Sequence, residues 1–125
     1  MHLGNAARSD IKKSVALARE ISGLAFGVYI GELPDGRQSA EARHVQLPSP
    51  ESAVLVALDP QARTIDIITG TDAHVVLDNR SCEFALLAFQ SCAGAGDIVG
   101  GIREALIVLA EHARQPKVYH LDEPA

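Results

Sequence analysis

The feature that most constrains the fold of this chain is an apolar run, Ala53 to Leu58, which no polar residue interrupts. Such a run favours a strand that is covered on both faces of a sheet, because a strand with one solvated face alternates apolar and polar residues. Asp59 and Pro60 follow and begin a short connection suited to a type I turn. Thr64 to Thr69 then alternates as a second strand. Two strands joined this tightly should pair antiparallel.

The N-terminal third of the chain predicts a helix, a strand and a short second helix. The first helix is expected to begin at Asp10 with Ser9 as its N-cap, and Gly23 occupies the left-handed position that commonly ends a helix. Leu24 to Glu32 alternates apolar residues with glycine and tyrosine, which is strand periodicity. Residues 38–45 have the composition of a short helix.

The C-terminal third predicts two longer helices. Residues 70–78 are interpreted either as a short strand or as a turn that tucks Val75 and Leu77 inward. Asp78 is expected to cap the helix that follows, and Asp97 is expected to cap the last helix, which carries a strong apolar stripe.

The expected order of elements fixes a topology. A strand, a crossover and a second strand favour a parallel pair, to which the hairpin adds an antiparallel third strand. We therefore expect an α/β fold with a small mixed sheet flanked by helices on both faces. A length of 125 residues fits one domain, taken as 9–115 with flexible ends at 1–8 and 116–125.

Charge and composition exclude several classes of partner. The chain carries 11 basic and 16 acidic side chains, a formal net charge of −5, and has two tyrosines, three phenylalanines and no tryptophan. A negative surface repels phosphate backbones, and few aromatic rings are available to stack on bases. Nucleic acid is therefore not expected as a partner, and the expected partner is a protein of unknown identity. The oligomeric state is left open.

Two further features indicate a cytoplasmic protein. Cys82 and Cys92 form no C-x-x-C pair and are interpreted as free, buried thiols, with a reactive Cys82 near a helix N-terminus as the alternative. No apolar stretch is long enough to span a membrane, and the first 13 residues lack the apolar region of a secretory signal.

Several short segments follow one another in a characteristic order from about Ser9 to Arg114. They are Ala18 to Gly23, Phe26 to Gly31, Ala53 to Pro60 leading through Arg63 and Ile65 to Ile67 and Gly70, Leu77-Asp78, and Gly96 to Ile102. Their order and spacing resemble the TPM domain family, especially its compact, soluble actinobacterial branch of uncharacterised proteins. The resemblance implies a three-layer α/β/α sandwich. It also implies acid-phosphatase-like activity, divalent-cation binding, or a role in assembling or repairing membrane complexes.

The acidic residues fall into two groups when the chain direction is followed. The C-terminal ends of the two parallel strands share one edge of the sheet, and the loop before the last helix returns to it, which places Asp35, Asp59 and Asp97 there. Asp72 and Asp78 form a second group at the opposite edge. Carboxylates and loop carbonyls are the ligands that Ca²⁺ and Mg²⁺ prefer, so the first group is a candidate metal site. The alternative is that these aspartates only cap helices and turns.

The sequence offers little other evidence for a catalytic or cofactor-binding site. The glycines at 94, 96 and 100 follow a helix instead of a strand, and Asp97 would repel a phosphate there, so no nucleotide cofactor is expected. No nucleophile paired with a base is recognisable, and the catalytic residues are unknown. The leading prediction is a non-enzymatic interaction or accessory module with a weak divalent-cation site. The alternative is a metal-dependent phosphatase acting on phosphomonoesters through Asp35, Asp59 and Asp97.

Overall fold

The apolar run of the sequence forms the central strand of a three-stranded sheet. In the computed structural model, which describes residues 3–114, β2 (Ala53–Asp59) lies between β1 (Ala25–Ile30) and β3 (Thr64–Thr69). β1 runs parallel to β2, and β3 runs antiparallel to it. Every residue of β2 is buried, which confirms the strand predicted from its lack of alternation.

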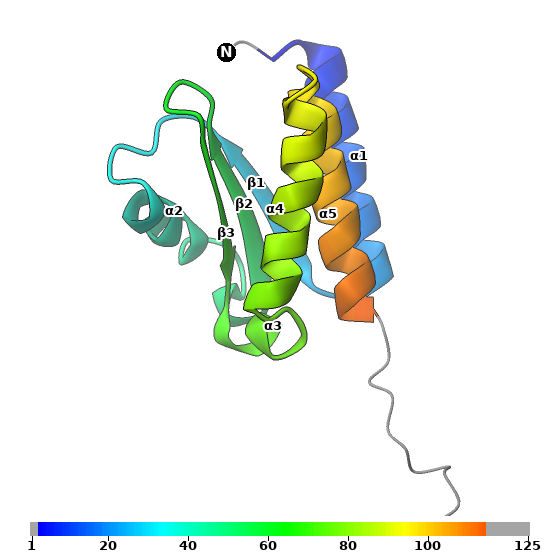
Figure 1. Ribbon diagram of the computed structural model, residues 1–125. Coiled ribbons are helices and arrows are strands. Elements are labelled where there is room, and N and C mark those ends of the chain that lie inside the picture. Colours follow the sequence, from blue (N-terminus) through cyan, green and yellow to red (C-terminus); the bar gives the residue numbers. More distant parts are fainter. Residues whose placement is uncertain (1–2, 115–125) are drawn as a thin grey trace, which may run out of the picture.

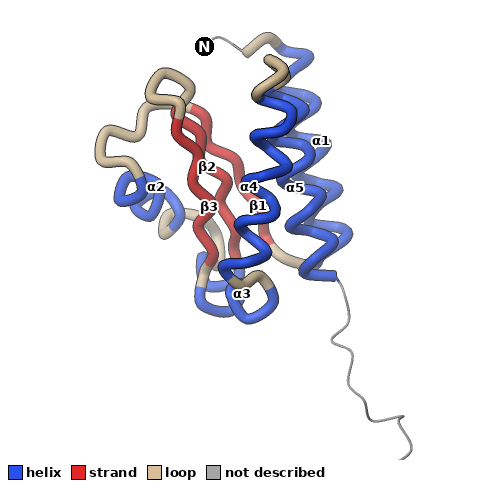
Figure 2. Tube along the Cα trace, in the orientation of Figure 1, coloured by secondary structure: helices blue, strands red, loops and turns tan. Residues whose placement is uncertain are grey.

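Helices cover both faces of this sheet (Figures 1 and 2). α1 (Asn5–Ser22), α4 (Asn79–Ala93) and α5 (Ile98–Arg114) form a layer on one face. α2 (Arg37–His44) lies on the other face, and the short α3 (Thr71–Val76) lies at the end of the sheet where β3 finishes. A 3-10 turn, Pro50–Ser52, precedes β2. The expected mixed sheet between two helical layers is therefore confirmed.

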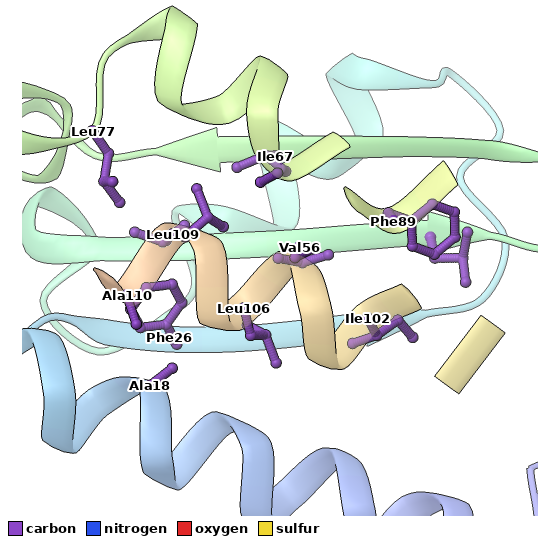
Figure 3. Close-up of a cluster of buried hydrophobic side chains, with 14 of the residues drawn as sticks. Ala18, Phe26, Val56, Ile67, Leu77, Phe89, Ile102, Leu106, Leu109 and Ala110 are labelled. Carbon is purple, nitrogen blue, oxygen red and sulfur yellow. The ribbon is translucent and has the colours of Figure 1, made fainter. Parts of the chain in front are cut away.

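The side chains of β2 divide the interior into two apolar clusters. Val54, Val56 and Leu58 point into the larger cluster, which is built with α1, α4 and α5. Leu55 and Ala57 point into the smaller cluster, which is built with α2. Figure 3 shows the larger cluster, where side chains of α5 pack against the sheet. The period of two along the strand thus sets which layer each residue contacts.

The first helix differs from its prediction at its start. It begins at Asn5, so the expected start at Asp10 with a cap at Ser9 is wrong. The residues before Ser9 include two alanines, the best helix formers, and the helix extends through them until Gly4, whose extended backbone makes it the N-cap. Gly23 ends the helix in the left-handed conformation (φ 76°), as predicted. The predicted flexible end at 116–125 lies outside the described residues.

Residues 70–78 also differ from their prediction. They form α3, and Leu77 is buried as expected while Val75 is 65% exposed. A strand would place both residues on one face, whereas a helix places residues four apart together. Ala73 and Leu77 therefore face the core and Val75 faces solvent.

Within residues 3–114, no helix combines the length and the apolar character needed to cross a membrane.

The residue after β3, Gly70, lies close against the 3-10 turn that precedes β2. Gly70 donates its N–H to the carbonyl of Ala53, at 2.9 Å, and lies against the backbone of Pro50 and Glu51. A methyl group at position 70 would overlap both of their carbonyl oxygens. We expect Gly70→Ala to lower the free energy of unfolding by about 1–3 kcal/mol, the usual range for overpacking. Urea unfolding measures this.

The control for this substitution is Gly4→Ala, where nothing lies within 4 Å of the added carbon. It should change the free energy of unfolding by less than Gly70→Ala does. Equal effects of the two substitutions would contradict the close approach at Gly70.

Candidate functional site

A cleft of about 850 Å³ opens between the β2–β3 turn and the junction of α4 and α5. Both lie at the same end of the sheet, opposite α3 (Figure 1). β2 enters the turn at Asp59 and β3 leaves it at Thr64, while α4 ends at Ala93 and α5 begins at Ile98. The cleft is therefore formed where two chain reversals face each other, and it adjoins the C-terminal end of a parallel strand, a common position for ligands in α/β folds.

The walls of the cleft are mainly apolar. Leu58 and Ile65 contribute from the two strands, and Phe89, Ala93 and Ile98 contribute from the two helices. Leu58 and Phe89 also belong to the larger core, so the cleft is a continuation of the apolar interior that reaches the surface. Such a surface favours an apolar ligand, because its burial removes apolar area from water.

Arg63 is the one charged side chain among the described residues that line the cleft. The polar remainder of the lining consists of Gln61, Thr64 and Gln90. In the described part of the chain, no aspartate, glutamate, histidine, cysteine or lysine lines the cleft. The cleft thus combines apolar walls with a single positively charged side chain, in a chain whose formal net charge is −5.

The backbone of Arg63 has φ 58°, in the left-handed region, where glycine is the residue that fits without strain. Ser49, which does not line the cleft, is the other non-glycine residue with a positive φ among residues 3–114. A side chain with a Cβ atom in this conformation costs on the order of 1–2 kcal/mol. Arg63 is the last residue of the turn before β3 begins, so the hairpin holds the arginine in this conformation at the rim of the cleft.

Asp59 is a buried structural carboxylate. Its Oδ2 accepts the N–H of Leu33 at 3.0 Å, and its Oδ1 accepts the N–H of Ala62 at 3.1 Å. These hydrogen bonds, that from Leu33 first, hold the pKa of Asp59 below its ordinary value. Alternation along β2 places Asp59 on the α2 side of the sheet, with Leu33, and Leu58 on the cleft side.

The other two members of the predicted metal site have different surroundings. Oδ1 of Asp97 accepts the N–H of Gly100 at 2.9 Å, which is an N-cap contact for α5. Asp35 is exposed, and its backbone N–H donates to the hydroxyl of Ser39. Between residues 3 and 114, no group of three or more histidine, cysteine, aspartate or glutamate side chains is placed to hold a metal ion. The Ca²⁺ or Mg²⁺ site, and the phosphatase activity that would depend on it, stay predictions.

The second acidic group lies at the α3 end of the sheet. Oδ1 of Asp78 accepts the N–H of Ser81 at 2.9 Å and its hydroxyl at 3.1 Å, which confirms Asp78 as the N-cap of α4. These bonds hold the pKa of Asp78 below its ordinary value. Asp72 is exposed in the first turn of α3.

The cysteines are free, as predicted, but both are half-buried instead of buried. Burial raises the pKa of the Cys82 thiol, and the nearby Asp78 carboxylate raises it further. The uncharged thiol is therefore favoured, which argues against the alternative of a reactive thiolate.

Sequence reasoning missed the cleft because it searched for acidic side chains. Leu58 and Ile65 lie in the two strands predicted on either side of the turn, and nothing local shows that they reach the surface at one place with Phe89. One signal was available: a hairpin turn of this length needs a left-handed residue near its end, and the sequence has Arg63 there instead of glycine or asparagine.

Residues 5–110 match the family model described as "Domain of unknown function (DUF5130)". The chain belongs to this family. Two similar proteins are the uncharacterised proteins MT2543 and Rv2468c from two strains of Mycobacterium tuberculosis, each 30% identical over 90 residues. The match covers 70% of this chain and 53% of each relative, so the DUF5130 chain spans about half the length of these curated relatives.

The fold of this DUF5130 domain also occurs in a solved structure. The NMR structure of BA42 protein from Bizionia argentinensis aligns with a TM-score of 0.76, over 90% of this chain and 82% of that one. The sequence identity is 11%, so the likeness shows a common fold alone.

The expected membership of the TPM domain family is wrong, because the family match and the mycobacterial relatives give DUF5130 and nothing shows a TPM domain. The segments that carried the resemblance are local folding signals. Asp78 and Asp97 cap helices, and Asp59 with Pro60 forms a turn, which many α/β domains need. Motifs of this kind identify elements of a fold and do not separate one family from another.

The surroundings of Asp59 predict an acid-dependent contribution to stability. Because its pKa is lower in the folded chain, the stabilisation is present above the unfolded pKa of about 4 and is lost as pH falls through the folded value. Asp59→Asn should lower the melting temperature at pH 7, since one of the two N–H groups loses its acceptor. The difference from the unmodified protein should shrink below about pH 4.

Thermal unfolding followed by circular dichroism between about pH 7 and pH 3 measures this difference. Asp35→Asn, at an exposed side chain, is the control and should change the melting temperature little at pH 7. A deficit for Asp59→Asn that stays constant throughout the titration would contradict a stabilising role for the charged carboxylate.

Proposed function

We propose that this DUF5130 domain is a non-catalytic binding module, which acts as an accessory domain by holding a small apolar molecule in the cleft between the β2–β3 turn and the α4–α5 junction. The observation that carries the proposal is the lining of the cleft, where apolar side chains from two strands and two helices surround few polar groups. Clefts of this character, with a volume of roughly 300–1,000 Å³, are typical of small-molecule sites.

Rigid elements support a preformed binding site. Leu58 belongs to the buried central strand, and Phe89 is 6% exposed in a helix that packs closely on α5. The ring of Phe89 lies against Gly101, where an added Cβ atom would come within 2.9 Å of it. A wall held in this way loses little conformational entropy on binding, which favours affinity for an apolar ligand.

The polar groups of the lining support binding over catalysis. Gln61, Gln90 and the hydroxyl of Thr64 can donate and accept hydrogen bonds, and the guanidinium of Arg63 can donate them. General acid–base or nucleophilic catalysis uses a group whose pKa can be matched to the reaction, such as histidine, a carboxylate, a thiol or an amine. The lining residues of this cleft orient and hold a ligand without supplying such a group.

Filling the cleft tests the proposal. The probe is N-phenyl-1-naphthylamine, a neutral apolar dye whose fluorescence rises when it leaves water. The unmodified domain should bind the dye saturably, and Ala93→Phe should weaken binding by about tenfold or more because the added ring occupies the cleft. Gln90→Trp, at an exposed lining position, should also weaken it and leaves the core untouched.

The matched control is Ala42→Phe, which adds the same ring at an exposed position of α2 on the other face of the sheet. It should bind the dye as the unmodified domain does. The proposal fails if the unmodified domain does not bind the dye, or if Gln90→Trp and Ala93→Phe, folded by circular dichroism, bind it unchanged.

A further inference from the structure

We propose that the ligand of this cleft is an amphipathic carboxylate, with Arg63 binding its head group and the apolar walls holding its chain. This inference rests on the proposed function and names the chemical class of the ligand. The first observation is electrostatic: among residues 3–114, the lining of the cleft includes one positive side chain and no negative one, while the whole chain has five more acidic than basic residues. A site that lacks carboxylates in an acidic protein favours a negatively charged ligand.

The second observation is that the structure leaves the guanidinium of Arg63 available. Among residues 3–114, one ion pair forms, between Arg37 and Asp66 at 3.6 Å, and Arg63 forms no ion pair. The acidic residue nearest in the turn, Asp59, lies on the opposite face of the sheet and accepts two backbone N–H groups. Arg63 is exposed, so a ligand can reach its donors without displacing a protein partner.

The third observation is the left-handed backbone of Arg63. Glycine would form this turn without strain, yet the chain has its one cleft-lining cation at this position. The turn accounts for the left-handed conformation but gives no reason to prefer arginine to glycine, and strained residues of this kind cluster at ligand sites.

The charge at the site favours a carboxylate over a phosphate monoester. A guanidinium offers a planar fork of donors that matches a carboxylate with two parallel hydrogen bonds. A single positive charge balances a monoanion, whereas a dianionic phosphate would keep a net negative charge within an acidic domain. Gln61, Gln90 and Thr64 offer further donors for the head group from the same lining.

Paired ligands of equal chain length test the inference. Decanoate, decan-1-ol and decyl phosphate are titrated into the domain, with displacement of N-phenyl-1-naphthylamine as the readout. The two anions are kept below their critical micelle concentrations and decan-1-ol below its solubility limit. The unmodified domain should prefer decanoate to decan-1-ol by about tenfold or more, the usual scale of a charge-assisted bidentate contact. The preference should fall as salt is raised. Tighter binding of decyl phosphate than of decanoate would overturn the assignment to a carboxylate.

Variants of the arginine separate anchoring from turn formation. Arg63→Gln should abolish the preference for decanoate and leave decan-1-ol binding unchanged, whereas Arg103→Gln, at an exposed position of α5, changes the net charge equally and should leave the preference intact. Arg63→Gly should also lose the preference, with a melting temperature no lower than that of the unmodified domain, because glycine relieves the left-handed strain.

The outcomes distinguish this inference from the proposed function. If decan-1-ol and the dye bind but Arg63 does not strengthen the binding of decanoate, the assignment to a carboxylate is wrong and the proposed binding function is still supported. If neither decan-1-ol nor the dye binds, the proposed function itself fails. A clear fall in the melting temperature of Arg63→Gly would show that the turn needs the arginine, and would remove the third observation.

Discussion

The burial of β2 on both faces is the constraint on which the rest of this structure depends. A strand of seven buried residues requires an apolar layer above and below it, and the chain supplies three helices for one face and α2 for the other. The alternation of its side chains divides the core in two. It also sends the last two residues in opposite directions, with Leu58 toward the cleft and Asp59 toward α2.

The hydrogen bonds of Asp59 connect this buried strand to the geometry of the cleft. Its carboxylate fixes Leu33 on one side and closes the turn through Ala62 on the other. Arg63, in its left-handed conformation, is the next residue along the chain before β3 begins. An aspartate that sequence reasoning placed in a metal site therefore accepts a hydrogen bond within the turn that carries the arginine of the cleft.

Periodicity predicted most of the fold, because strand and helix patterns are local properties of the sequence. The strands β2 and β3 and the helix caps at Gly23 and Asp78 were all predicted from the sequence. The helix within residues 70–78 was not predicted, since a six-residue segment is too short for its periodicity to distinguish a helix from a strand or a turn. The order of elements did bring the turn near residue 60 and the junction before the last helix to one edge of the sheet. The cleft itself was not predicted, because no local pattern shows that Leu58, Ile65 and Phe89 reach the surface together there.

The central claim is that this end of the sheet is a binding site for an amphipathic carboxylate. The most direct measurement is a titration of the isotope-labelled domain with decanoate, followed by the backbone amide resonances in two-dimensional NMR. The account predicts saturable shifts concentrated in residues 58–65 and 89–98, on the two sides of the cleft. Shifts centred on the α2 face, or no saturable shifts in the two cleft segments, would contradict it.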